Sequence, residues 1–188
     1  MARIAILGWG SLIWCPRQLQ YKGEWQRGGP VLPIEFSHIS SDGRLTLVID
    51  VRDGENVTTQ YSASTFENLD EAIENLRCRE CMPSVDYVGF VNLNTGKKRG
   101  RNADVVGKIR EWAQQNHFDA VIWTDLRPNF ASKRLERFTV GNAVAYLQSL
   151  CGKTEQEARK YIQKAPEEVN TPVRRKLQEI GWLDEERA

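Results

Sequence analysis

Long hydrophobic runs are missing from this sequence of 188 residues. No apolar stretch approaches the roughly 18 residues that indicate a membrane span. An excess of charge of one sign is missing as well, because 26 Lys and Arg residues balance 25 Asp and Glu residues and leave a formal net charge of +1. Without a strong overall field, neither nucleic acid nor an anionic membrane is an expected partner. The composition therefore favours a small or neutral partner.

Cysteine and histidine are scarce, with four Cys and two His in the chain. The N-terminal apolar segment that ends at Cys15 superficially resembles a short signal peptide. The Gly8-Trp9-Gly10 turn interrupts this segment, however, and the bulky Trp14 occupies a position where processing needs a small residue. Without a secretory signal, the cysteines are expected to be reduced thiols in a cytoplasmic protein.

Short apolar runs between turn clusters predict the strands of the fold. The predicted strands are Arg3–Leu7, Val31–Ser40, Leu45–Asp50, Val57–Ser62, Asp86–Leu93 and Ala120–Trp123. Connections as short as Ser41-Asp42-Gly43 and Asp53-Gly54 predict that much of the sheet is antiparallel. A chain of this length is expected to form one domain, covering residues 1–188.

Helical patterns lie before and after the last predicted strands. Ser64 with Glu67 resembles a capping box and predicts a helix start, and the sequence becomes mainly helical from Asn102. Three helices are expected to close the chain, with boundaries signalled by Gly152, Thr154 to Glu157, and Thr171-Pro172. The sequence thus predicts an α+β domain with the sheet in residues 1–101 and a mainly helical extension in residues 102–188.

The first strand leads into the glycine turn Gly8-Trp9-Gly10-Ser11. Glycine tolerates positive φ, and such turns point consecutive backbone N–H groups into one concavity that suits an anion or oxyanion. The turn lacks the third glycine of a dinucleotide fingerprint, because Ile13 stands there, and no Gly-Lys-Ser/Thr follows. A structural turn and a binding site therefore both remain open at this point.

One glutamate interrupts an apolar helix stripe. The spacing of Phe66, Leu69, Ile73 and Leu76 continues to Glu80, where the pattern calls for an apolar residue. If the helix extends that far, the carboxyl group points inward, and desolvation raises its pKa toward the range of a general base. The alternatives are a helix that ends at Cys78 and leaves Glu80 exposed, or a Glu80 that pairs with an arginine such as Arg44 or Arg79.

Two segments resemble known motifs. Leu7-Gly8-Trp9-Gly10-Ser11-Leu12-Ile13-Trp14-Cys15-Pro16 is similar to the opening motif of the γ-glutamyl cyclotransferase superfamily, especially the branch that acts on glutathione. Ala72, Leu76, Arg79 and Glu80 stand as in the second motif of that branch, whose glutamate is the acid/base residue. The motifs occur in the family's order and at about its spacing, and the resemblance covers about the first half of the chain.

The resemblance implies a fold, a reaction and a site. The fold would be a small, curved, mostly antiparallel β-barrel with flanking helices, and the substrate would be a small γ-glutamyl compound. Its own α-amine would attack the γ-carbonyl and release 5-oxoproline, without metal or cofactor. Glu80 would carry the proton, while Trp9, Gly10, Ser11 and Leu12 would hold substrate oxygens through backbone N–H groups.

Departures from the family pattern concern the substrate. Trp9 replaces the tyrosine usual in the first motif, and Cys81 to Asp86 stand where the family carries glycines before a tyrosine. Tyr87 is the candidate for that tyrosine and for a further substrate-binding residue. The C-terminal helices would either cover the pocket or form a homodimer interface.

Other functions have weaker support in the sequence. A non-catalytic module of the same fold that binds a γ-glutamyl or acidic ligand is the main alternative. Cys78 and Cys81 form a C-x-x-C pair, but a helix end disfavours a thiolate, and His38 and His117 are too remote in sequence to complete a zinc site. The basic loop Asn94–Arg101 is expected to be a solvated turn, with an anion or RNA contact as the alternative. Asp125 follows a buried strand and is expected to cap a helix or brace a loop, with a ligand site as the alternative.

Overall fold

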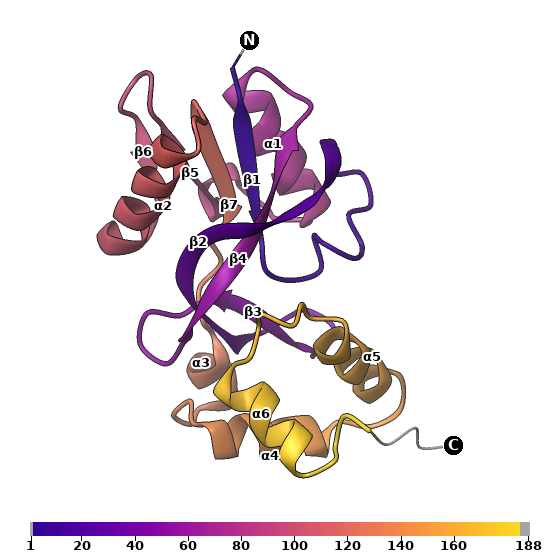
Figure 1. Cartoon of the computed structure of the whole chain (residues 1–188). Helices are drawn as coiled ribbons and strands as arrows, with labels where there is room; N and C mark the ends of the chain where they lie inside the picture. The colour runs from indigo at the N-terminus through magenta and orange to yellow at the C-terminus, as the bar shows by residue number, and fades with distance from the viewer. Residues whose placement is uncertain (1, 185–188) are drawn as a thin grey trace. The chain divides into compact units, whose positions relative to one another are not determined.

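The computed structural model describes residues 2–184 as an α+β fold (Figure 1). Its strands are β1 (Ile4–Gly8), β2 (Tyr21–Ile39), β3 (Leu45–Ile49), β4 (Glu55–Ser64), β5 (Val88–Asn92), β6 (Lys98–Arg99) and β7 (Ala120–Thr124). Its helices are α1 (Leu69–Arg79), the 3₁₀ helix η1 (Val85–Tyr87), α2 (Ala103–Gln115), α3 (Phe130–Arg134), α4 (Val140–Ser149), α5 (Gly152–Gln163) and α6 (Pro172–Glu179). None of the helices in the described residues is long and apolar enough to cross a membrane.

The strands pair in the order β3-β2-β4-β1-β7-β5-β6. The pair β1–β7 is parallel, whereas β1–β4, β2–β3, β5–β6 and β5–β7 are antiparallel. The mainly antiparallel sheet predicted from the short connections is therefore confirmed. The barrel is not confirmed, because the mixed sheet is open, with β3 and β6 at its two edges.

The described chain divides into two compact units. Unit 1 comprises residues 2–32 and 58–126, and unit 2 comprises residues 33–57 and 127–184. Strands β2 and β4 each contribute residues to both units. This division differs from the predicted one at residues 101 and 102, and the interpretation of residues 1–188 as one domain stays a prediction.

Unit 1 has helices on both faces of its strands, and side chains of successive strand residues point to opposite faces. The face that carries Ile4, Ile6 and Ile122 forms one buried cluster with Ala72, Ile73 and Leu76 of α1. On the opposite face, the fully buried Trp123 lies close to Gly89, Gly100 and Val106 of α2. A Cβ at Gly89 would lie 2.1 Å from Trp123 Cε2, so only glycine leaves room for this indole.

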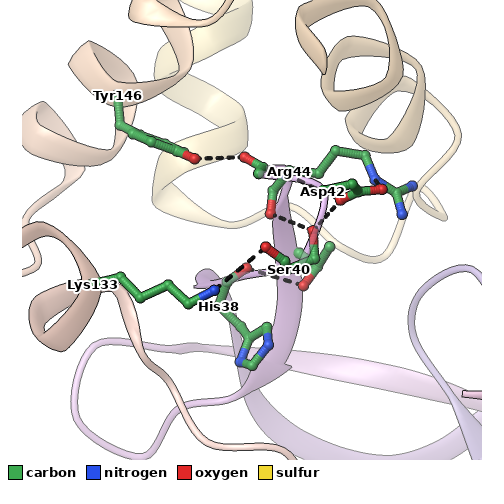
Figure 2. A network of polar contacts seen from close by, with 8 residues as sticks. His38, Ser40, Asp42, Arg44, Lys133 and Tyr146 are labelled. Atoms are coloured by element: carbon green, nitrogen blue, oxygen red, sulfur yellow. Dashed lines mark hydrogen bonds and ion pairs between the residues drawn. The ribbon is translucent and has the colours of Figure 1, made fainter. Parts of the chain in front are cut away.

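The hairpin β2–β3 of unit 2 is held at its turn by polar contacts (Figure 2). Lys133 Nζ of α3 donates to the Ile39 carbonyl at 3.0 Å, and the Tyr146 hydroxyl of α4 donates to the Gly43 carbonyl at 2.6 Å. Within the turn, Ser40 Oγ donates to Asp42 Oδ1 and Arg44 Nε donates to Asp42 Oδ2. These contacts give turn carbonyls hydrogen-bond donors from α3 and α4, so the polar cluster at the turn has a structural role.

A buried carboxyl group lies at the start of α6 in unit 2. Glu35 is completely buried on β2, and its Oε1 and Oε2 accept hydrogen bonds from the amides of Phe36 at 2.7 Å and Val173 at 3.4 Å. Burial raises the pKa of Glu35 to about 7, although hydrogen bonds from Thr171, Phe36 and Val173 oppose this shift and nearby Asp50 adds to it. The carboxyl group therefore titrates near neutral pH.

Helix starts were predicted with mixed success. The Thr171 hydroxyl accepts from the Arg174 amide and caps α6, with Pro172 as its first residue, as predicted. The start at Ser64 was wrong, because Ser64 ends β4 and Asn68 caps α1 through the amides of Asp70 and Glu71. The start at Thr154 was also wrong, because α5 begins at Gly152. In the described part of residues 127–184 four helices form instead of three, because Phe130–Arg134 adds the short α3.

Candidate functional site

The glycine turn follows β1 directly and folds into a helical turn. The Ile13 amide donates to the Gly10 carbonyl at 3.0 Å, and the Cys15 amide donates to the Ser11 carbonyl at 2.9 Å. Gly8 is required by packing, since a Cβ there would lie 2.6 Å from Trp25 Cζ3. Strand β1 thus ends at Gly8, next to the indole ring of Trp25, and the chain turns immediately after it.

The amides that open this turn keep their hydrogen-bonding capacity. Within residues 2–184, the N–H groups of Gly10, Ser11 and Leu12 donate to no other group of the protein. The first N–H groups of a helical turn lack intrahelical acceptors because no helical carbonyl precedes them, and they point in the same direction along the axis of the turn. The turn therefore offers three consecutive donors to an anionic or carbonyl oxygen.

The side chains of the turn have a structural role. Trp9 and Leu12 are each 5% exposed, and Leu12 belongs to the apolar cluster beneath α1. Ser11 Oγ accepts a hydrogen bond from Arg79 Nη2 at 3.1 Å. The Trp9 ring is therefore part of the packing and not an exposed wall, and the backbone amides are the groups of the turn that remain without a partner among the described residues.

Glu80 sits at the C-cap of α1, immediately after the last helical residue. Cys81 adopts the left-handed conformation, with φ of 53°, and its amide donates to the Cys78 carbonyl. The Met82 amide donates to the Arg77 carbonyl, so residues 77–82 form a Schellman motif. This motif fixes the backbone at Glu80, because the amides of the next two residues, Cys81 and Met82, donate back to carbonyls of the last helical turn.

The Glu80 carboxyl is largely withdrawn from solvent. Its side chain is 19% exposed, and Oε1 lies 2.9 Å from Arg79 Nη1. Burial raises the pKa of Glu80, and the charges of Arg79 and Arg17 and the Thr124 hydroxyl oppose that effect. A carboxyl group whose pKa is raised and whose side chain is partly open to solvent is suited to exchanging protons with a substrate.

Arg79 connects the glutamate with the turn. Its side chain is 4% exposed, and Nη2 donates both to Ser11 Oγ and to the Cys15 carbonyl at 2.6 Å, while Nη1 pairs with Glu80. Two groups that are separated by 68 positions in the sequence, Ser11 and Arg79, are thereby in direct contact. The predicted catalytic and substrate-holding segments are brought to one place, and the predicted alternative of an Arg79 partner for Glu80 is also realised.

The strand register brings further residues to the same edge. Ile6 pairs with Ile122 in the parallel ladder β1–β7, so the carboxyl ends of both strands lie together. Thr124, the last residue of β7, pairs with Val88, directly after Tyr87. Tyr87 is 39% exposed, and its carbonyl accepts from the Asp125 amide. The edge therefore combines the turn, Thr124 and Tyr87, and whether Tyr87 binds substrate stays a prediction.

The remaining polar candidates have structural partners. Asp125 Oδ2 accepts from the Arg101 amide at 2.9 Å, which is the predicted loop-bracing role. All four cysteines are free and exposed, and the hydrogen bond from the thiol of Cys78 to Glu74 raises the pKa of Cys78. A raised pKa is the opposite of what a redox-active thiolate at Cys78 requires. Among residues 2–184, no group of three His, Cys, Asp or Glu side chains could hold a metal ion.

From the sequence alone, two side chains of this edge were given no role, and a third, Arg79, was given only part of its role. Arg17 is exposed, has a φ of 52°, and acts by its charge on Glu80. Thr124 gave no signal beyond its place after a buried strand, and Arg79 was considered only as an ion-pair partner. Its position next to Glu80 in the second motif was the available signal.

Comparisons of the chain with models of protein families, with curated proteins and with solved structures found no significant match.

Proposed function

We propose that this chain is a γ-glutamyl cyclotransferase-like enzyme that releases 5-oxoproline from a γ-glutamyl amine or peptide, with Glu80 as its acid/base residue. The observation that carries the proposal is the link from Glu80 through Arg79 to Ser11, next to three unengaged amides. A proton carrier and a set of oxyanion donors are the two parts that an intramolecular aminolysis requires.

Each proton in the proposed reaction has a place to go. The Glu80 carboxylate takes a proton from the substrate α-ammonium, and the freed amine forms a C–N bond to the γ-carbonyl carbon. The carbonyl oxygen becomes an oxyanion, held by the amides of Gly10, Ser11 and Leu12. The original amide C–N bond then breaks as Glu80 delivers its proton to the leaving nitrogen, and the carbonyl re-forms in the lactam. The attacking nitrogen still carries a surplus proton, which it gives to the freed Glu80 carboxylate, and the released amine takes this proton up and leaves as an ammonium ion. The products are 5-oxoproline and the released amine or peptide.

The electrostatic surroundings of Glu80 support this role. The raised pKa of Glu80 makes its carboxylate a stronger base, whereas the charges of Arg79 and Arg17 limit the rise and favour the ionised form. Arg17 is the exposed member of this pair, and we assign it the substrate's α-carboxylate. The family's reaction uses no metal or cofactor, and none enters the steps above.

One observation favours a second function, a non-catalytic module that binds a γ-glutamyl or acidic ligand. The Nη1–Oε1 contact of 2.9 Å pairs Glu80 with Arg79, and a paired carboxylate is a weaker base than an unpaired one. In such a module the amides of the turn and Arg17 would bind the ligand, and Glu80 would only orient Arg79.

The experiment that separates these functions is a search for 5-oxoproline. Purified protein is incubated with glutathione, γ-glutamyl dipeptides and γ-glutamyl amines between about pH 6 and 9, and the product is measured by mass spectrometry. We expect release from at least one substrate, and complete loss of release in Glu80→Gln. Glu71→Gln, an exposed carboxylate on the same helix, is the matched control and should retain full activity.

Either of two results would contradict the enzyme. The first is the absence of 5-oxoproline with every substrate while the protein is folded. The second is a Glu80→Gln variant that turns over at the parental rate. Ligand binding by calorimetry without turnover, unchanged in Glu80→Gln, would establish the binding module instead.

A further inference from the structure

Thr124 is the last residue of β7 and faces the side of the sheet that α1 covers. Residues 120 and 122 belong to the apolar cluster beneath α1, and alternate strand residues share a face. The next residue of that set is Thr124. Its neighbour Trp123 lies on the opposite face, near Val106 of α2.

The alternation through Ala120 and Ile122 predicts an apolar side chain at position 124, but Thr124 carries a hydroxyl there. Thr124 Oγ1 is buried, and it makes no aligned hydrogen bond to any of the described residues. A buried hydroxyl without a partner costs free energy, so such a group in a native structure needs an explanation. The Glu80 carboxyl is near enough to sense this hydroxyl, although the two groups are not aligned as a hydrogen-bonded pair.

A threonine hydroxyl can rotate about its C–O bond, which makes a small adjustment sufficient to complete such a pair. Catalytic hydrogen bonds are often long or poorly aligned without substrate and become shorter in the complex. The glutamate already uses Oε1 for Arg79. A second donor to the carboxylate would fix the rotation of its plane, which one ion pair leaves undetermined.

We propose that Thr124 is a positioning residue for Glu80, whose hydroxyl donates a hydrogen bond to the ionised carboxyl group and aims its free oxygen at the substrate ammonium. This inference rests on the proposed function for the identity of the substrate. The place of Thr124 on the α1 side of β7 and its buried hydroxyl without an aligned partner are observations that do not depend on that function. Thr124 keeps its own proton throughout and takes part in no bond-breaking step.

Other charged groups near Glu80 must be kept constant in any test. Arg79 of its own helix and Arg17 of the loop after the glycine turn both act on it. On the strands packed against α1, Asp125 pairs with Arg101, and Asp86 before β5 pairs with Arg99. The phenol of Tyr87 and the free, exposed thiols of Cys15 and Cys81 are further titratable groups of this edge. A substitution at Thr124 changes none of these charges.

The test measures the pKa of Glu80 directly, without turnover. Protein labelled with ¹³C at the glutamate side-chain carboxyl is titrated by NMR, and the Glu80 resonance is assigned by its loss in Glu80→Gln. Thr124→Val removes the hydroxyl at constant shape, and Thr124→Ser keeps it. Loss of a donor to the charged form raises the pKa of a carboxyl group. Thr124→Val should therefore raise the Glu80 pKa by about one unit, whereas Thr124→Ser should leave it within a few tenths of the parental value.

Turnover provides the second measurement. In Thr124→Val the acidic limb of the kcat/KM profile should move upward by the same interval, with about a tenfold loss of kcat below that limb. KM should change little, because the hydroxyl acts through Glu80. Thr59→Val is the matched control: its buried hydroxyl donates to the Pro30 carbonyl, so its removal should lower stability without moving the Glu80 titration.

The results separate the inference from the proposed function. An unchanged Glu80 pKa in Thr124→Val would overturn the positioning role. An equal shift of that pKa in Thr124→Val and Thr124→Ser would overturn it as well. If the Val variant does not fold, Thr124→Ala takes its place in the same comparison with Ser. A shift specific to removal of the hydroxyl in a protein that releases no 5-oxoproline would support the hydrogen bond and reject the enzyme.

Discussion

Arg79 and Glu80 are consecutive in the sequence, yet Arg79 is the more deeply buried of the two, at 4% against 19% exposure of the side chain. Its guanidinium pairs with the carboxyl group of its neighbour and donates to Ser11 Oγ and the Cys15 carbonyl. A lysine has one point charge and cannot match three acceptors in different directions. Arg79 therefore links the glycine turn to α1 by hydrogen bonds, in addition to the apolar packing of Leu12.

Arg79→Lys should lower the free energy of unfolding by about 2 kcal/mol, because a buried network loses part of its donors. Urea denaturation followed by circular dichroism measures this change. Arg52→Lys is the control, since Arg52 is 71% exposed and lies 4.0 Å from Asp53. It should stay within about 0.5 kcal/mol of the parent. Equal stability of both variants would show that the Arg79 contacts contribute nothing.

The left-handed residue after Glu80 is a cysteine where glycine is the usual choice. A side chain in this conformation costs about 1 kcal/mol, and Cys81 has a φ of 53° and is exposed. Cys81→Gly should therefore stabilise the protein by up to about 1 kcal/mol, as measured by thermal unfolding.

The same variant, Cys81→Gly, removes the C-x-x-C pair. Retention of 5-oxoproline release would exclude a disulfide between Cys78 and Cys81 as a requirement, whereas loss of release would favour a thiol function.

The packing of the Trp123 indole against Gly89 can be tested by a pair of alanine substitutions. Gly89→Ala places a Cβ 2.1 Å from a fully buried indole, so the strand or the ring must move. Overpacking of this kind costs about 1–3 kcal/mol. Gly107→Ala in α2 has nothing within 4 Å of the added atom and should stabilise the helix by about 0.5–1 kcal/mol. Opposite signs in chemical denaturation are expected, and a neutral Gly89→Ala would contradict the packing.

Glu35 predicts a pH dependence of stability. Its pKa is raised from 4.5 to about 7, so the folded protein keeps a proton that the unfolded chain releases. This contribution is complete below about pH 4.5 and is lost as the pH rises through about 7. At 1.36 kcal/mol per unit, the unfolding free energy should fall by up to about 3 kcal/mol between those limits. Glu35→Gln should flatten the curve, and parallel curves for parent and variant would disprove the assignment.

The sequence was a good guide where local signals and burial agree. β3 and β7 were each predicted to within one residue at either end, because short apolar runs bounded by turns have one obvious interpretation. The stripe through Ile73 and Leu76 also led to Glu80, which lies on the α1 side away from full exposure. Two capping-box predictions failed, at Ser64 and Thr154, because the pattern is short and tertiary pairing decides whether the segment is strand or helix interior.

Other features depend on contacts between distant segments. β2 extends from Tyr21 to Ile39, although its first half has few apolar residues, because pairing with neighbouring strands compensates for its exposure. Glu35 is buried on that strand only because the start of α6 supplies hydrogen bonds from 138 positions away. Arg79 and Thr124 likewise acquire their surroundings from the fold. A linear pattern of residue types does not contain such partners.

Neither compact unit is continuous along the chain, and this has a consequence for how the protein is made. The β2–β3 hairpin is synthesised before α4 and α5. Tyr146, which donates to the Gly43 carbonyl, and Tyr161, whose hydroxyl accepts from the Leu47 amide, follow about a hundred residues later. At about 5–20 residues per second of synthesis, the apolar face of the hairpin is uncovered for several seconds. A nascent chain stalled near residue 126 would be a natural client for chaperones.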